Sequence, residues 1–287
     1  MSAAALSTIR DLMSGPDLDP DDLGGRDPKF IREVGQPFCD WLRKSYFRAD
    51  VEGLERVPRN GSFIAVANHS GGPMLPDIWL MVSYFWEVFG VDAPSYALVH
   101  DAAFRIPGLR NSLVRIGALR ASRRNAEKVL EAGGVLLITP GGDLEALRSF
   151  RRRNRLELGG KTAFVELALR YGVPVLPVVN VGAHEVYFTL FSSTALAKYS
   201  GLERLTRVKT VPLNLGLPWG LWLTGFLPYL PLPAKVSFMV AEPVRFPKHD
   251  ELAANLDAIE LNFARIAATM QNMLDELASR RRLPVIG

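Results

Sequence analysis

The feature that most restricts the fold of this chain is a regular alternation of short apolar runs with stretches of helical pattern, beginning near Asp50. Short apolar runs between turn residues favour buried strands, and apolar residues at helical spacing favour helices. The expected strands cover 62–67, 95–99, 134–139, 174–180 and 235–240, and the expected helices lie near 77–89, 124–132 and 160–171. This alternation predicts an α/β fold with a mixed, mostly parallel central sheet that is flanked by helices.

Helical extensions are expected at both ends of the chain. Residues 1–26 have the pattern of a weak helix followed by an acidic linker rich in proline and glycine. Pro28 to Phe47 predicts an amphipathic helix, which either caps the core or lies on a bilayer surface. A long amphipathic helix from about His249 to Arg282 closes the chain. The predicted division is an N-terminal extension and linker (1–49), one main domain (50–245) and a C-terminal helix (246–287).

The composition is that of a globular protein with some affinity for lipid. Hydrophobic residues make up 48% of the chain and charged residues 22%, yet the mean hydropathy of +0.09 is high for a freely soluble protein. The single cysteine, Cys39, excludes an internal disulfide and a cysteine-based metal cluster. Because the N-terminus lacks a secretory pattern, we expect a cytoplasmic protein.

The positive charge is concentrated in clusters of arginine. The net charge is +4, and the clusters are Arg110, Arg115, Arg120, Arg123 and Arg124; Arg148, Arg151, Arg152, Arg153 and Arg155; and Arg280, Arg281 and Arg282. Such clusters either attract phosphate groups or form a solvated basic surface. Nucleic acid is not an expected partner, because the basic stretches lack interleaved aromatic residues and no nucleic-acid-binding module is recognised.

The run from Thr210 to Ala234 carries no charged residue and is long enough to span a bilayer. It also contains five prolines, at positions 212, 218, 228, 231 and 233. Each proline removes a backbone donor, so a straight spanning helix is not expected. We predict an interfacial or protein-covered segment that lines an apolar groove.

A histidine follows the first apolar strand directly. His69 comes after the run Phe63 to Ala67, and Asp77 stands at the far end of a loop bent by glycine and proline. Imidazole titrates near neutrality, and a carboxylate that accepts its second N–H fixes the tautomer and raises its basicity. This pair predicts a general base that removes a proton from a bound hydroxyl.

A second chemical feature follows the apolar strand near Val135. The strand runs into Pro140-Gly141-Gly142 and then into a segment with helix-forming residues. Glycines at a strand exit allow the backbone to approach a ligand, and free N–H groups there can hold an anion or a developing oxyanion. The same glycines can also serve only to make a tight turn.

The order of these pieces resembles the four sequence blocks of the glycerolipid (lysophospholipid) acyltransferase superfamily, which includes 1-acylglycerol-3-phosphate acyltransferases. The blocks are His69 with Asp77, Gly117-Ala118-Leu119-Arg120-Ala121-Ser122-Arg123, Thr139-Pro140-Gly141-Gly142 and Val173-Pro174-Val175-Leu176-Pro177-Val178. The resemblance covers roughly residues 50–245. Asn68-His69-Ser70-Gly71-Gly72, together with the later Glu145-Ala146, is most similar to the monoacylglycerol-acyltransferase-like branch. The C-terminal ending is similar to that of actinobacterial members.

The sequence departs from the superfamily pattern in two blocks. Seven residues separate His69 from Asp77, where the superfamily has four, so Asp77 either returns to the imidazole or simply caps the following helix. The usual Phe-Pro-Glu-Gly-Thr-Arg block is also altered, and its acidic and basic functions are expected at Glu145 and Arg148.

The resemblance implies an O-acyltransferase in which no protein nucleophile is required. A fatty acyl thioester of coenzyme A or acyl carrier protein would be the co-substrate, without a further cofactor, and a lipid hydroxyl would attack it. His69 would take the hydroxyl proton, Asp77 would hold His69, and the N–H groups of Gly141 and Gly142 would stabilise the oxyanion. Arg123 and Arg148 are the expected phosphate ligands, with Lys161 a weaker candidate.

Several alternatives are open from the sequence. The basic clusters favour a lysophospholipid acceptor such as 1-acylglycerol-3-phosphate, whereas the branch admits mono- or diacylglycerol. A non-catalytic lipid-binding protein and a hydrolase are the rival functions. His100 and His184 are expected to be structural, His249 is expected in a loop, and no metal site is expected. We expect peripheral attachment to the cytoplasmic face of the membrane through 28–47 and 210–234.

Overall fold

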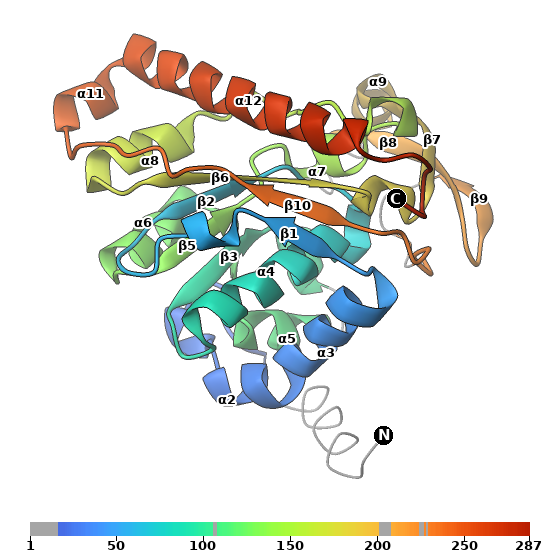
Figure 1. Cartoon of the computed structure of the whole chain (residues 1–287), viewed down its shortest axis with the longest axis horizontal. Helices are drawn as coiled ribbons and strands as arrows, with labels where there is room; N and C mark the ends of the chain where they lie inside the picture. Colours follow the sequence, from blue (N-terminus) through green and yellow to red (C-terminus); the bar gives the residue numbers. More distant parts are fainter. Residues whose placement is uncertain (1–16, 106–107, 201–207, 224–226, 228) are drawn as a thin grey trace.

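The computed structural model describes residues 17–105, 108–200, 208–223, 227 and 229–287. Its centre is a seven-stranded sheet (Figure 1). In spatial order the strands are β1 (Asp50–Glu52), β10 (Ser237–Val240), β6 (Val175–Val181), β2 (Ile64–Ala67), β5 (Val135–Ile138), β3 (Ser95–Val99) and β4 (Ala118–Arg120). From β6 to β4 the strands run parallel, whereas β10 is antiparallel to β6 and β1 is parallel to β10. The predicted mixed, mostly parallel sheet is therefore confirmed.

Helices cover both faces of this sheet (Figure 1). The α-helices of the described residues are α2 (Pro28–Phe30), α3 (Gln36–Trp41), α4 (Pro76–Phe89), α5 (Leu109–Arg115), α6 (Arg123–Glu131), α7 (Gly142–Ala146), α8 (Ala163–Tyr171), α9 (Thr194–Tyr199), α11 (Asp250–Ala254) and α12 (Leu256–Ser279). The expected strands and helices of the central part are present within a few residues of their predicted bounds. The short strands β1 and β4 and the helix α5 were not predicted.

Strand β2 shows how the sequence divides the core. Ile64 and Val66 pack in the cluster that includes α6, α8 and α12, whereas Ala65 and Ala67 pack in the cluster that includes α4 and α5. Successive side chains of a strand point to opposite faces, and all four residues are buried. A strand buried on both faces reads as a continuous apolar run, which explains why this segment was recognisable from the sequence.

The terminal extensions are helical, with differences in detail. The segment from Pro28 to Tyr46 is a continuous helical stretch in which π-helical turns at Ile31–Gly35 and Leu42–Tyr46 follow α2 and α3. The predicted C-terminal helix is broken at Asn255, whose side chain accepts a hydrogen bond from the Ala258 N–H and so caps α12. The helix expected near the N-terminus falls largely within residues 1–16, outside the described residues.

The uncharged run from Thr210 to Ala234 was expected to be an interfacial or protein-covered segment and not a straight spanning helix. Part of it forms the antiparallel strands β8 (Val211–Gly216) and β9 (Gly220–Leu223), which pair with β7 (Phe188–Ser193) in a separate three-stranded sheet. This sheet lies with α9 at one side of the molecule (Figure 1). The prolines prevent a continuous helix in this segment, and strand pairing instead provides hydrogen-bond partners for its backbone N–H and C=O groups. Among the described residues, no helix has the length and apolar character needed to cross a bilayer.

Candidate active site

The predicted site residues gather where the parallel strands end. His69 follows β2, Thr139 to Gly142 follow β5, and His100 follows β3. The carboxyl ends of parallel strands lie at one edge of the sheet, where open α/β folds place their ligands. A cavity of about 280 Å³ opens at this edge, and His69, His100, Thr139 and Gly142 are among its lining residues.

The structure brings His69 and Asp77 together. His69 Nδ1 lies 2.8 Å from Asp77 Oδ2, and the same oxygen accepts the Ser70 N–H at 2.8 Å. A carboxylate can only accept, so the imidazole proton lies on Nδ1 and the Nε2 lone pair is available to a ligand. Asp77 is fully buried, whereas His69 retains a small exposed area and lines the cavity. The arrangement suits a general base.

Asp77 does not cap its own helix. The N-cap position of α4 is Leu75, and no side chain makes a cap hydrogen bond there. The Asp77 carboxylate turns instead toward the loop that precedes the helix, where it meets His69 and Ser70. The capping alternative is therefore wrong, and the longer loop does return the carboxylate to the imidazole.

The surroundings of His69 favour its protonated form. Burial lowers the pKa of His69, and the charge of Arg148 acts in the same sense. The charge and hydrogen bond of Asp77, together with the charge of Glu145, raise the pKa and outweigh these effects. The net pKa lies above the ordinary value of histidine. A raised pKa makes the neutral imidazole a stronger base.

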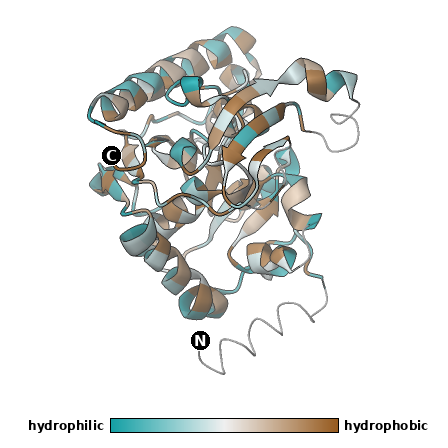
Figure 2. Ribbon diagram, turned by 90° about the vertical axis from the view of Figure 1, so that its right-hand side faces the viewer, coloured by the Kyte–Doolittle hydropathy of each residue, from teal (hydrophilic) through white to brown (hydrophobic). Residues whose placement is uncertain are grey.

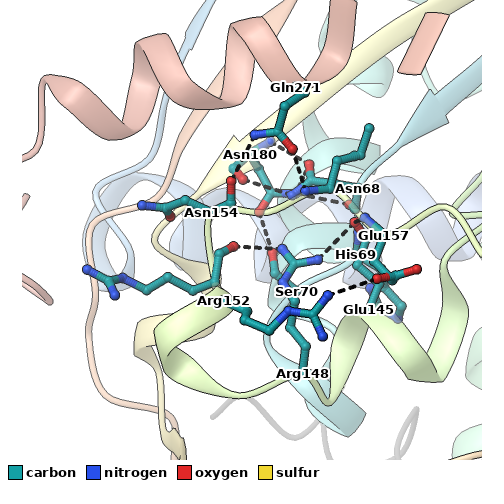
Figure 3. A network of polar contacts seen from close by, with 12 residues as sticks. Asn68, His69, Ser70, Glu145, Arg148, Arg152, Asn154, Glu157, Asn180 and Gln271 are labelled. Atoms are coloured by element: carbon teal, nitrogen blue, oxygen red, sulfur yellow. Dashed lines mark hydrogen bonds and ion pairs between the residues drawn. The ribbon is translucent and has the colours of Figure 1, made fainter. Parts of the chain in front are cut away.

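Behind His69 lies a buried ion pair between Glu145 and Arg148 (Figure 3). Glu145 Oε2 accepts the His69 N–H at 2.8 Å, and Oε1 accepts the Glu157 N–H at 3.0 Å. Arg148 Nη1 lies 2.9 Å from Glu145 Oε1. Burial raises the pKa of Glu145, with Arg148 and the two N–H groups acting in the opposite sense. Burial also lowers the pKa of Arg148, which the Glu145 charge opposes.

This burial bears on the predicted roles of both residues. The side chain of Arg148 is 3% exposed and that of Glu145 is 0% exposed. Neither residue is among those that line the 280 Å³ cavity. The structure thus places Glu145 in contact with the backbone of His69, and places Arg148 where it balances the Glu145 charge, not where it meets a bound phosphate.

The two glycines of the Pro-Gly-Gly turn have different surroundings. A Cβ on Gly141 would lie 2.2 Å from the Glu157 carbonyl oxygen and 2.4 Å from Glu145 Oε2, so only glycine fits at this close approach. Gly142 has a φ of +55° and lines the cavity. Its N–H donates to the Thr139 carbonyl at 3.1 Å. The expectation of a free oxyanion donor at Gly142 is therefore not met.

Arg123 lies away from the cavity. It is in the first turn of α6, where it forms ion pairs with Glu127 and Glu166 at 2.9 and 2.7 Å. The hydrogen bonds that Arg123 donates to Glu166 and Glu127 raise the pKa of Arg123 above its ordinary value. It does not line the cavity, so the structure does not support its predicted contact with an acceptor phosphate.

Lys161 is at the cavity, as predicted. Among the residues that are described, it is the one lysine or arginine of the cavity wall, and Asp143 lines the wall as well. Burial and the charge of Lys209 lower the pKa of Lys161, while Asp143 and Glu145 act in the raising sense. The polar part of the wall is therefore nearly balanced in charge.

The remainder of the wall is apolar. Leu75, Ile78, Val99, Leu137 and Leu147 line the 280 Å³ cavity together with several alanines. A second, smaller cavity of about 30 Å³ shares Leu75, Ile78, Val99 and Leu137 and extends toward Trp86 and Leu113. The two cavities therefore lie next to each other, with Leu75 and Ile78 at the start of α4 in the walls of both.

A network of amides that we did not predict fixes the end of β2 (Figure 3). Asn68 Oδ1 accepts the Asn180 N–H at 2.7 Å, and Asn68 Nδ2 donates to the Asn180 carbonyl at 3.0 Å. Ser70 Oγ donates to Asn180 Oδ1 at 2.5 Å. The signal in the sequence is an asparagine at the end of each of two apolar strands that prove to be neighbours.

The other histidines differ in position. His100 lines the cavity, and its Nδ1 accepts the Ala102 N–H at 3.1 Å. His184 is buried beside His69, and burial and the charges of Arg148 and His69 lower its pKa well below the ordinary value. His249 caps α11 by accepting the Leu252 N–H. Within the described part of the chain, no group of three His, Cys, Asp or Glu residues could hold a metal ion.

Comparisons with known proteins complete the description of the site. The sequence model of a family described as diacylglycerol acyltransferase matches residues 85–284. An uncharacterized protein of Mycobacterium tuberculosis is 28% identical over 98% of this chain and 75% of its own length. Diacylglycerol O-acyltransferase 2 of Danio rerio is 26% identical over 68% of this chain and 54% of its own.

A solved structure has a similar fold. The crystal structure of the 1-acyl-sn-glycerophosphate (LPA) acyltransferase PlsC from Thermotoga maritima superposes with a TM-score of 0.54 and 23% sequence identity. The match covers 89% of this chain and 81% of that one.

Proposed function

Since the chain belongs to the diacylglycerol acyltransferase family and is an O-acyltransferase, we propose that it moves a fatty acyl group from a thioester to the free hydroxyl of an acylglycerol. The resemblance to glycerolipid acyltransferases seen in the sequence is confirmed. One observation carries the proposed mechanism: His69, which pairs with Asp77, lines a cavity whose other lining residues are mostly apolar.

In the proposed reaction, the Nε2 of His69 removes the proton of the acceptor hydroxyl. The hydroxyl oxygen attacks the thioester carbonyl and forms the ester bond, the carbon–sulfur bond breaks, and the proton on His69 passes to the departing thiolate. Asp77 keeps the imidazole in the required tautomer and stabilises the imidazolium that forms in between. The donor is the thioester of coenzyme A or of acyl carrier protein.

The apolar wall of the larger cavity supports a position for the acyl chain. Leu75, Ile78 and Leu137 are among its lining residues, together with His69. Burial of each methylene contributes about 0.8 kcal/mol. An acyl chain along this wall would bring the thioester carbonyl toward His69.

Charge at the cavity favours a neutral acceptor over a phosphorylated one. The sequence suggested a lysophospholipid because of its arginine clusters, but Arg123 is paired with two glutamates and Arg148 is buried against Glu145. Lys161 lines the cavity together with Asp143. An acceptor phosphate would meet little net positive charge there, so a mono- or diacylglycerol is the proposed acceptor.

A phosphorylated acceptor is the second candidate, and Lys161 is the observation that favours it. Lys161 reaches the cavity, and the charge of Lys209 acts on it. Lys161→Gln separates the two candidates: it would lower turnover of lysophosphatidate and leave turnover of monoacylglycerol unchanged. Mass spectrometry of products from mixed acceptors reads out both.

Glu145 and Arg148 are proposed as positioning residues. Glu145 holds the backbone N–H of His69 and that of Glu157, and so ties the loop after β2 to the loop that precedes α8. Arg148 neutralises a carboxylate that would otherwise be buried without a partner.

Peripheral attachment to the cytoplasmic face of the cell membrane is the proposed location. Exposed apolar side chains of the β7–β9 sheet support contact with lipid. The proposed acceptor is itself a lipid, which the enzyme would take from the bilayer.

The direct test supplies purified protein with acyl-coenzyme A and mixed acylglycerols and lysophospholipids. His69→Ala is expected to lower transfer about 10³-fold, and His249→Ala, which removes a helix-capping histidine that does not line the cavity, is the matched control. Wild-type turnover by His69→Ala would refute the mechanism. Stoichiometric lipid binding without consumption of thioester, or release of free fatty acid alone, would refute the proposed reaction.

A further inference from the structure

The β7–β9 sheet has its polarity reversed relative to a normal half-buried sheet. Leu215 pairs with Leu221, and Leu213 pairs with both Leu223 and Phe191, so these residues share the outer face. Leu221 and Leu223 are 59% and 63% exposed. The opposite face carries Thr189, Asn214 and Trp222, all of which are buried. An antiparallel sheet with one face in water normally shows the reverse alternation.

The apolar surface continues beyond the strands. Leu217 and Trp219, in the turn between β8 and β9, are exposed, as are Leu196 and Tyr199 of α9. Most of the large hydrophobic side chains that are exposed in the described part of the chain lie between Leu190 and Leu230. Figure 2 views this side of the molecule, with hydrophobic residues in brown along the strands. An exposed apolar patch of this extent marks an interaction surface.

Several features favour lipid as the occupant. The run 210–234 contains no charged residue, whereas protein interfaces usually have a polar rim. Exposed lysines stand beside the sheet instead, at Lys198 of α9 and at Lys209 just before β8. At a membrane surface, such lysines can contact anionic headgroups while the neighbouring apolar side chains contact the acyl chains. Tryptophan, as at Trp219, is typical of the interface between headgroups and acyl chains.

The helical stretch Pro28 to Tyr46 is a less suitable surface. Its residues Phe30, Ile31, Cys39 and Leu42 are buried in the protein. Phe38 and Trp41 are exposed but contact one another, and Phe38 also meets Trp79 edge to face. The apolar side of this helix is thus mostly used by the protein core.

The inner face of the sheet rests on the loop that carries His69. Trp222 lies 6.0 Å from Tyr187 and Tyr187 lies 4.5 Å from Tyr229, measured between ring centroids. The Tyr229 hydroxyl donates to the Gly71 carbonyl. Val208, three residues before β8, lines the cavity. A bilayer on the outer face would therefore lie close to the cavity and to the loop that carries His69.

We propose that the outer face of the β7–β9 sheet, with Trp219 and α9, is the surface by which this enzyme docks on a bilayer that contains anionic lipid. The proposal rests on the proposed function only in the choice of a lipid surface over a protein partner. It assigns membrane contact to this sheet and not to the helical stretch 28–46.

The test measures cosedimentation with vesicles of phosphatidylcholine and phosphatidylglycerol. The double variant Leu221→Asp with Leu223→Asp is expected to lower the partition coefficient at least about 100-fold, since each leucine contributes roughly tenfold. Lys198→Gln with Lys209→Gln is expected to lower it about fivefold per lysine, and only on vesicles with phosphatidylglycerol. Phe38→Ser with Trp41→Ser is the matched control and is expected to bind as the wild type does.

A second measurement guards against misfolding. Turnover of a short-chain thioester and a water-soluble short-chain acylglycerol, without vesicles, is expected to be equal in the wild type and in the Leu221 and Leu223 variant. The milder pair Leu221→Ala with Leu223→Ala replaces the aspartates if that turnover falls, with an expected loss of binding of about 10-fold or more.

The outcomes separate docking from catalysis. The docking proposal is overturned if the leucine variants bind vesicles like the wild type, or if the Phe38 and Trp41 variant loses binding instead. It is also overturned if the wild type is a dimer that the leucine changes dissociate, with vesicle binding unaffected. Loss of vesicle binding in the leucine variants, together with a wild type that turns over no thioester, would leave docking intact and refute the proposed reaction.

Discussion

The carboxyl edge of the central sheet and the β7–β9 sheet distribute polarity in opposite ways. At the edge, Asp77, Glu145 and Arg148 are buried, and each has a partner of opposite charge or a hydrogen-bond donor. In the small sheet, Leu221 and Leu223 face outward while Asn214 is buried. Burial of charge without a partner is strongly unfavourable, and exposure of leucine to water is mildly so. Partners offset the burial of the charges at the edge, whereas Leu221 and Leu223 of the small sheet remain exposed. We propose that proton transfer accounts for the first arrangement and lipid contact for the second.

The largest expected effect comes from removing the base at the polar edge. His69→Ala is expected to lower kcat about 10³-fold, because a positioned general base contributes between roughly 10² and 10⁴. Vesicle binding by the same variant should be unchanged, since the apolar sheet is intact. A loss of vesicle binding in step with kcat would show that the two regions do not act separately.

Asp77→Asn is expected to lower kcat about 100-fold and to change the pH profile. In the proposed mechanism catalysis needs neutral His69, so turnover of the wild type should rise as pH increases through the His69 pKa. Burial lowers this pKa, and Asp77 together with Glu145 raises it, with a net result above the ordinary value. Without the Asp77 charge the pKa falls, and the rising limb of kcat/KM moves to lower pH. An unmoved limb would mean that another group titrates there.

Glu145→Gln tests the buried ion pair. The change leaves Arg148 buried without its counter-charge, so the free energy of unfolding should fall by about 3 kcal/mol in urea denaturation. Glu127→Gln removes one partner of Arg123 on the exposed side of α6 and should change it by less than about 1 kcal/mol. Equal effects from the two variants would contradict the difference in burial.

The smallest effect is expected at Arg123. Arg123→Ala should change the KM for any acceptor less than about twofold, since the residue is a surface ion-pair partner of Glu127 and Glu166. Steady-state kinetics with lysophosphatidate and with monoacylglycerol give the comparison. A tenfold rise in KM for lysophosphatidate alone would contradict this expectation and indicate that Arg123 binds the acceptor phosphate.

The sequence by itself was sufficient to predict β10, β6, β2, β5 and β3 of the central sheet and to propose His69 and Asp77 as a pair. Strands such as β2 and β6 are buried on both faces, so they appear as continuous apolar runs whatever their neighbours are. His69 and Asp77 lie eight residues apart, so a single loop decides whether they meet. The proposed roles of the two residues and the domain division at 50 and 245 stay predictions.

Only the tertiary structure decided the surroundings of the remaining site residues and the fate of the uncharged run. Arg123 and Arg148 look alike in the sequence, yet one is paired on a surface helix and the other is buried. Whether a glycine N–H is free depends on its turn, as at Gly142. The strands β8 and β9 lack a clear alternation of polar and apolar residues, because their outer faces are apolar and so are Pro212 of β8 and Trp222 of β9. These outcomes depend on contacts between residues far apart in the chain, which no local pattern encodes.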